Sequence, residues 1–188
     1  MNTSSDQLGL EIEPPQIKSR ENVRDRGEVF TSRKVVNEML DLLPPEAFGL
    51  EVTYLEPACG EGVFLAEILR RKLERHALSE THVGLALSSL YGVDIDCVNV
   101  AVARQRIAYV VDRFFVSRCA MPSDSMLGAV QGILAANIVV GDFLKPETVT
   151  LCQWRGIGTP NPTQRFFRLS EGMRQTEAAA LPQLELAL

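Results

Sequence analysis

Three carboxylates and a pair of glycines are the residues of this sequence whose types and spacing could do chemistry. Glu56, Asp94 and Asp142 each end or follow a short apolar run of the kind that forms a buried strand. Glu56 opens the segment "LEPACGEGVFL", in which Gly60 and Gly62 enclose another acid. Glycine lets the backbone approach a ligand closely, and a carboxylate accepts hydrogen bonds from hydroxyls and amines. The set predicts a site for a ligand that carries such donors.

The glycine turn differs from the turns that bind phosphate. It lacks the lysine of GxxxxGK[ST] and the third glycine of GxGxxG, and a pyrophosphate there would face the negative charges of Glu56 and Glu61. S-adenosylmethionine (SAM) suits the turn because it carries an ammonium and a sulfonium, and its only anion is a carboxylate. Asp94 would then accept from the ribose hydroxyls and Asp142 from the adenine amine. An ordinary tight strand-to-helix connection is the alternative for the turn taken alone.

Apolar faces for the adenine ring would come from the residues that follow two of these acids, Ile95 and Phe143. Cys59 is interpreted as a small turn residue and not as a nucleophile, because no histidine lies near it in the sequence. The basic cluster of Arg70, Arg71 and Lys72 is interpreted as a solvated helix face, with nucleic-acid contact as the alternative.

These residues need a scaffold of alternating strands and helices. The apolar spacing predicts helices at 33–43, 62–75, 80–89, 97–114 and 123–135, strands at 53–56, 90–96 and 137–143, and weaker strands at 148–154 and 164–169. Ser32 or Thr31 can cap the first helix, and Pro44-Pro45 stops it. This alternation predicts an α/β fold with a mostly parallel sheet, which binds ligands beyond the carboxyl ends of its strands.

Composition limits the remaining classes. The chain has 188 residues, a net charge of −5 and four scattered cysteines, which suits one core-forming domain without a disulfide framework or zinc site. It has no run long enough to span a membrane and no signal peptide, so we expect a cytoplasmic protein. We expect a flexible arm at 1–20, one domain at 21–170 and a helical or disordered tail at 171–188.

The sequence resembles the SAM-dependent adenine-specific DNA methyltransferases of restriction-modification systems, including short forms found on phages and mobile elements. "RGEVFTSRKVVNEML" resembles the segment before the first strand, "LEPACGEGVFL" the glycine motif, "YGVDID" the ribose motif and "VVGDFL" the adenine motif. The resemblance implies a Rossmann-like class I methyltransferase fold with a reduced sheet. It also implies these SAM-binding residues: Phe30, Thr31, Glu56, Pro57, Ala58, Cys59, Gly60, Gly62, Phe64, Asp94, Ile95, Asp142 and Phe143.

The catalytic Asn/Asp-Pro-Pro-aromatic motif of that family has no counterpart after Asp142. Asn161-Pro162 follows in the right direction but continues Thr163-Gln164, so it is either a degenerate catalytic loop or a plain proline-rich turn. Two interpretations therefore stay open. The chain is a DNA methyltransferase that needs a second chain for target binding and chemistry, or it is a non-catalytic SAM-binding regulatory or remnant subunit. Methylation of RNA or protein is a weaker alternative.

Overall fold

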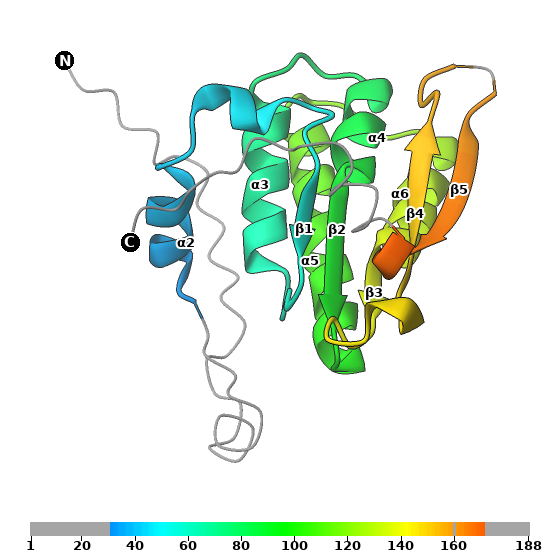
Figure 1. The fold of residues 1–188 in the computed structure, drawn as a ribbon. Coiled ribbons are helices and arrows are strands. Elements are labelled where there is room, and N and C mark those ends of the chain that lie inside the picture. The colour runs from blue at the N-terminus through cyan, green and yellow to red at the C-terminus, as the bar shows by residue number, and fades with distance from the viewer. Residues whose placement is uncertain (1–30, 160, 172–188) are drawn as a thin grey trace. The chain divides into compact units, whose positions relative to one another are not determined.

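The computed structural model of the chain describes residues 31–159 and 161–171 (Figure 1). Phe30, the predicted arm and the part of the predicted tail beyond Glu171 lie outside the described residues. Within this part of the chain no helix has both the length and the apolar character needed to cross a bilayer.

The described elements follow the predicted alternation of helices and strands. In chain order they are α2 (Arg33–Leu40), η1 (Pro45–Phe48), β1 (Tyr54–Glu56), α3 (Val63–Glu74), α4 (Glu80–Ser88), β2 (Leu90–Asp94), α5 (Cys97–Val116), α6 (Asp124–Asn137), β3 (Ile138–Val140), η2 (Pro146–Thr148), β4 (Thr150–Arg155) and β5 (Thr163–Arg168). Each predicted helix and strand is present. Three end more than one residue earlier than predicted: the first helix ends at Leu40, before Pro44-Pro45, the second strand ends at Asp94, and the third strand ends at Val140.

Side-chain caps fix the starts of three helices. The hydroxyl of Ser32 accepts from the amide of Val35 at 3.4 Å, as one of the two predicted caps for α2. The carboxylate of Asp96 caps α5, and the hydroxyl of Ser123 caps α6. A polar N-cap residue directly before the helical pattern of apolar residues therefore fixes where each of these helices begins.

The three strands β1, β2 and β3 form one parallel sheet in the order β1-β2-β3. This confirms an α/β fold with a small parallel sheet. Glu56 on β1 lies opposite Gly92 on β2, and Asp94 lies opposite Val140 on β3. Because the strands are parallel, their carboxyl ends meet at one edge of the sheet.

The helices of the described chain pack on one face of this sheet. Leu90 on β2 belongs to the large core formed with α2 to α6, and an added side chain at Gly92 would meet Leu65 of α3 at 2.8 Å. Tyr91 and Val93 point to the opposite face, where they pack against a second cluster with Leu151. In Figure 1 the helices α3 and α5 lie together behind the strands.

The last two strands, β4 and β5, form a separate antiparallel hairpin and do not join the parallel sheet. The base of the hairpin covers the second face of the sheet, and the hydroxyl of Tyr91 donates to the carbonyl of Cys152 at 3.2 Å. The loop of the hairpin meets α4, where Gly158 comes so close to Thr81 that no side chain would fit. The sequence predicted both strands but not their pairing with one another.

Candidate functional site

The three strand-end acids lie at the same edge of the sheet, in the order Glu56, Asp94, Asp142. The carbonyl of Asp94 accepts from the amide of Gly141 at 2.9 Å, so the chain that leads to Asp142 runs beside the end of β2. β1 flanks the other side of β2. Asp94 is thus at the centre of this carboxyl edge, where a ligand of a parallel sheet is expected.

The glycine turn is tied directly to Asp94. The amide of Gly60 donates to Oδ2 of Asp94 at 2.8 Å. The amide of Cys59 donates to the carbonyl of Val93 at 2.9 Å, and the amide of Gly62 donates to the carbonyl of Cys59 at 2.8 Å. The sequence motif after β1 and the acid at the end of β2 therefore form one structural unit, although 34 residues separate Gly60 from Asp94.

The two glycines of the turn have different reasons to be glycine. Gly60 has a φ of 48°, and an added Cβ would meet nothing within 4 Å. Gly62 has a φ of 75°, and an added Cβ would lie 2.8 Å from Cβ and 2.9 Å from Cα of Ala103 on α5. Gly62 permits close helix packing, whereas the open space over Gly60 can receive a ligand.

The carboxylate of Asp94 already accepts three hydrogen bonds from the chain. Besides the amide of Gly60, Oδ1 accepts from the amide of Asp96 at 2.8 Å and from Nδ2 of Asn99 at 3.3 Å. A carboxylate has about four acceptor positions, so about one remains for a ligand. Binding of both hydroxyls of a ribose at Asp94 would displace one of these donors. Asn99, which is buried, was not predicted as part of the site.

The charge of the turn is lower than its acids suggest. The guanidinium of Arg106 donates to the carbonyl of Glu61 at 2.8 Å and to its carboxylate at 3.1 Å. Glu61 is therefore neutralised by α5, so its expected repulsion of phosphate is weaker than its charge implies. Burial raises the pKa of Glu56, against a hydrogen bond from the amide of Ala58 that lowers it. Glu56 is thus the acid of the turn that lacks a basic partner among the described ion pairs.

The predicted adenine end of the site is open. Oδ1 of Asp142 accepts from the amide of Leu144 at 2.9 Å, and Nζ of Lys145 lies 3.5 Å from Oδ2. Ile95 is 63% exposed, while Phe143 is half-buried and packs against the cluster on the second face of the sheet. A solvated apolar side chain beside two acids suits a flat ring that carries amine and hydroxyl donors.

The remaining predicted site residues differ in their burial. Pro57 and Ala58 are exposed, Phe64 packs half-buried against the helix-side core, and Thr31 directly precedes the cap of α2. Burial, with a smaller contribution from Asp94 and Glu56, raises the pKa of the Cys59 thiol to about 12. A thiol with that pKa is protonated at neutral pH, which agrees with a packing role.

Asn161 is not brought together with the other predicted residues. It lies in the loop between β4 and β5, where its carbonyl is 3.5 Å from the position of an added Cβ on Gly156. This loop meets the start of α4 through Gly158 and Thr81. In Figure 1 the loop lies at the top, opposite the arrowhead of β2 that leads into Asp94.

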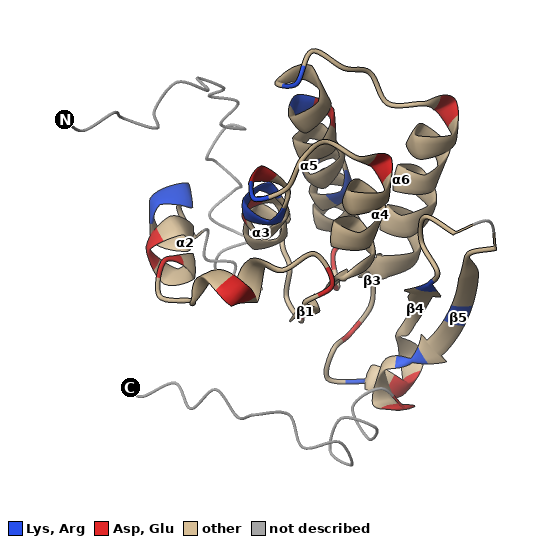
Figure 2. Cartoon of the chain, turned by 90° about the horizontal axis from the view of Figure 1, so that it is seen from above, with Lys and Arg blue, Asp and Glu red and all other residues tan. Residues whose placement is uncertain are grey.

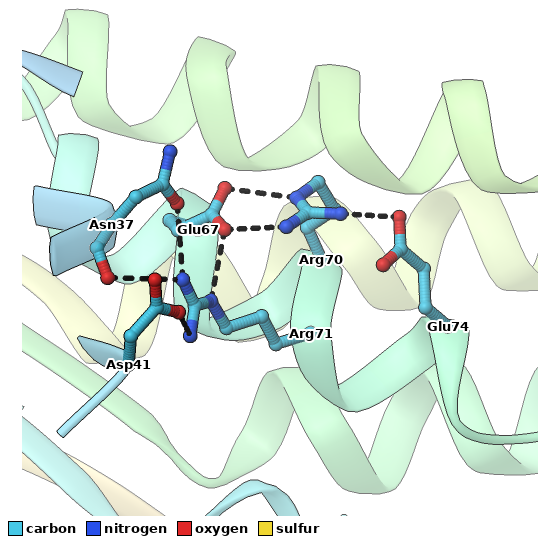
Figure 3. Close-up of polar contacts among 6 residues, drawn as sticks. All are labelled: Asn37, Asp41, Glu67, Arg70, Arg71 and Glu74. Atoms are coloured by element: carbon cyan, nitrogen blue, oxygen red, sulfur yellow. Dashed lines mark hydrogen bonds and ion pairs between the residues drawn. The ribbon is translucent and has the colours of Figure 1, made fainter. Parts of the chain in front are cut away.

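Two arginines of the basic cluster on α3, Arg70 and Arg71, form ion pairs and hydrogen bonds within the fold, as Figure 3 shows. Glu67 is buried and binds both Arg70 and Arg71. Arg71 also contacts Oδ1 of Asp41 at 2.7 Å and Oδ1 of Asn37 at 3.1 Å, so it ties α3 to the end of α2. Burial alone would raise the pKa of Glu67, but the two arginines outweigh it and leave the pKa lowered.

Lys72 is fully buried, so the expectation of a solvated helix face was wrong at this position. Its ammonium donates to the carbonyls of Gly49, Leu50 and Val52 and to the hydroxyl of Ser89. These acceptors precede β1 and β2, so Lys72 fastens the amino ends of both strands.

Two clefts of the described chain lie away from the carboxyl edge. One of about 380 Å³ lies between α2, η1 and α3, and one of about 470 Å³ lies beside Gly49, Val52 and His76. Neither is lined by a residue of the glycine turn or by a strand-end acid.

Comparison with known proteins gives one relevant similarity. Over 81 residues the chain is 30% identical to the Type II methyltransferase M.VspI of Vibrio sp. (strain 343), a stretch that covers 43% of this chain and 16% of that enzyme. No family model matches the chain, and no solved structure matches it. The similarity thus covers less than half of this chain and a small part of that enzyme.

Proposed function

We propose that the chain is a SAM-binding methyltransferase domain with a reduced Rossmann-like sheet. The observation that carries this proposal is the hydrogen bond between the amide of Gly60 and the carboxylate of Asp94, which joins a glycine turn to the acid at the end of the next strand. The similarity to a Type II methyltransferase over 81 residues supports it independently.

In this proposal different residues of the carboxyl edge bind different parts of the cofactor. The open backbone at Gly60 receives the methionine end, beside the negative charge of Glu56. Asp94 accepts from the ribose, with Asn99 or Gly60 releasing its hydrogen bond. The adenine lies against Ile95 and Phe143, with its amine toward Asp142. SAM is favoured over dinucleotides because the turn lacks a third glycine and retains the charge of Glu56.

The acceptor in this proposal is the amine of adenine in DNA. That nitrogen attacks the methyl carbon as the sulfur leaves, which forms S-adenosylhomocysteine (SAH) and a proton. The protein must align the three atoms and exclude water. The sequence after Asp142 continues through η2 into a hairpin and contains no Asn/Asp-Pro-Pro-aromatic segment. We therefore propose that a second chain orients the target base. The alternative is a non-catalytic SAM-binding regulatory or remnant subunit.

Isothermal calorimetry with SAM, SAH and NAD tests the cofactor. We expect SAM and SAH to bind and NAD to bind far more weakly. The Asp94→Ala variant should lose about 1 to 3 kcal/mol of binding free energy, the scale of a hydrogen bond to a charged group. Asp112→Ala, an exposed acid on α5, is the matched control. Absence of heat with SAM and SAH, or equal binding of NAD, would refute the cofactor assignment.

Transfer of tritiated methyl groups to unmethylated plasmid tests the need for a partner. We expect little incorporation by the purified chain, and the same low level for Asn161→Ala because Asn161 lies at the far end of the sheet from Asp94. Robust transfer by the wild type would contradict partner dependence. Its loss in Asn161→Ala would place the acceptor-binding loop at Asn161.

A further inference from the structure

The distal half of the β4–β5 hairpin presents four polar side chains on one face. Gln153 is directly opposite Arg165, and Arg155 is directly opposite Thr163. Because side chains alternate along a strand, all four project from the same face, which we call the ribbon face. All four are exposed, and the guanidinium of Arg155 is 3.5 Å from Oε1 of Gln153, as expected for neighbours on one face.

Contacts on both faces anchor the hairpin to the fold. On the reverse face, Cys152 is fully buried and Trp154 packs against the helix-side core. Toward the base, on the same face as Gln153 and Arg165, Leu151 and Phe167 pack against the sheet through Tyr91 and Val93. The ribbon face is therefore held in a fixed orientation by the buried base of the hairpin and by the packed reverse side of β4, which suits a preformed contact surface.

The hairpin has the opposite charge character to the chain as a whole. Between Glu147 and Glu171 the sequence has three arginines and no acidic residue, in a chain with a net charge of −5. Figure 2 shows the basic positions on β4 and β5, with acidic positions only near the base. Within residues 31–159 and 161–171, neither Arg155 nor Arg165 forms an ion pair. Their charges are available to an anionic partner.

We propose that the ribbon face binds duplex DNA in the major groove. The major groove admits a two-stranded β-ribbon, and arginine pairs with guanine while glutamine pairs with adenine through two hydrogen bonds each. Threonine contacts either base edges or the thymine methyl group. A ribbon with two arginines, a glutamine and a threonine on one face therefore combines attraction to phosphate with base recognition.

The position of the hairpin agrees with the proposed function, on which this inference rests for the choice of DNA. The base of the hairpin is joined to the carboxyl edge, since the amide of Leu169 donates to the carbonyl of Val149 at 2.9 Å and Arg168 donates to the carbonyl of Glu147. Both acceptors follow Asp142 within a few residues along the chain. The hairpin is therefore continuous with the edge where the methyl donor would lie, and its ribbon face lies toward the opposite end of the sheet.

Fluorescence anisotropy with a labelled duplex at low salt tests the ribbon face. The double variant Arg155→Gln/Arg165→Gln should bind about tenfold or more weakly than the wild type, with a shallower salt dependence. The double variant Lys34→Gln/Arg75→Gln is the charge-matched control, because both residues are exposed and lie outside the hairpin. We expect the control to change affinity by less than about threefold, because neither residue contacts the duplex in this proposal.

A third variant separates base contacts from simple attraction and guards against misfolding. Arg155→Lys/Arg165→Lys keeps both charges but cannot form the paired contacts of a guanidinium, so it should retain the salt dependence and lose affinity for its preferred duplex. Equal losses in the hairpin and control variants, or tighter binding of a single strand than of the duplex, would overturn the inference.

The same samples distinguish this inference from the proposed function. Loss of DNA binding in the glutamine variant with unchanged SAH binding supports both. Normal SAH binding by a wild type that binds no duplex refutes the ribbon inference and leaves the cofactor assignment intact. Arginine-dependent DNA binding without any SAH binding refutes the proposed function and leaves the ribbon face supported.

Discussion

The two ends of the parallel sheet carry charges of opposite sign in opposite surroundings, a buried cation at the amino end and acids beside solvent at the carboxyl end. At the amino end, the ammonium of Lys72 is fully buried and is surrounded by three carbonyls and a hydroxyl. At the carboxyl end, three acids stand beside an open surface where Ile95 is 63% exposed. At the amino end, hydrogen-bond acceptors of the chain itself surround the buried cation. The carboxyl end holds anionic acceptors in place and leaves part of their capacity to a ligand.

In the proposed function, one small sheet keeps the residues that stabilise the fold apart from those that would bind the ligand. A buried ammonium must have its hydrogen bonds satisfied by the protein, so Lys72 fixes the loops that enter β1 and β2. Asp94 instead accepts from Gly60, Asp96 and Asn99 and shapes the turn, while a position remains for a ligand. Mutations at the amino end should therefore change folding, and mutations at the carboxyl end should change binding.

The largest effect is expected at Lys72. Lys72→Met removes the donor for three carbonyls and Ser89, so the free energy of unfolding should fall by about 3 kcal/mol. SAM affinity of the folded fraction should not change. Urea unfolding followed by circular dichroism measures the first quantity and calorimetry the second. Lys34→Met is the control, since the side chain of Lys34 is 85% exposed. Equal stability of the two variants would contradict a structural role for Lys72.

Stability should also depend on pH through Lys72. Burial lowers its pKa from 10.5 to about 7, while the unfolded chain keeps the ordinary value. Between these values the unfolded state binds more protons, so the contribution of Lys72 to stability grows as pH rises and is lost as pH falls to about 7. Hydrogen bonds from Nζ to carbonyls favour the ammonium, so they narrow the pH range over which stability rises.

Denaturant titrations from pH 7 to 10 measure this dependence. The free energy of unfolding of the wild type, relative to Lys72→Met, should rise by at most about 1.4 kcal/mol per pH unit. A difference that stays flat over this range would mean that Lys72 keeps its proton in the fold throughout.

The next effect distinguishes the two glycines of the turn. Gly62→Ala should lower the free energy of unfolding by about 2 kcal/mol or more, because its Cβ would collide with Ala103 and its φ is positive. Gly60→Ala adds only the strain of a left-handed residue, about 1 kcal/mol, but should weaken SAM binding. Thermal unfolding and calorimetry on both variants test this. The reverse pattern would assign ligand contact to Gly62.

Much of the fold could be predicted from the sequence because apolar spacing and caps act locally. The pairing of β4 with β5 could not, because two weak strands carry no signal that says which sheet they join. The hydrogen bond between Gly60 and Asp94 also joins residues far apart in the chain. Their residue types therefore predicted both as site residues but could not predict the bond between them. Arg106, the partner of Glu61, lies on α5, and the net charge of the chain does not indicate which acids are paired.

Two missed residues did leave a signal. Apolar pairs recur on α3 at Phe64-Leu65 and Ile68-Leu69, and the next pair at this spacing is Lys72-Leu73. The periodicity therefore placed Lys72 on the buried face, although its residue type suggested solvent. Asn99 likewise lies beside buried Val100 on α5, where a polar residue within an apolar stripe indicates a hydrogen-bonding role.

Amide chemical shifts recorded during titration with SAH test the contrast between the two ends most directly. The account predicts that the amide signals of Gly60, Ile95 and Asp96 shift on binding. The amides of Gly60 and Asp96 donate to the carboxylate of Asp94, and Ile95 directly follows Asp94 in the chain. The amides of residues 49–52, which surround Lys72, should stay unchanged. Shifts concentrated at residues 49–52, or none at Gly60 and Asp96 under saturating SAH, would contradict a cofactor site at the carboxyl edge.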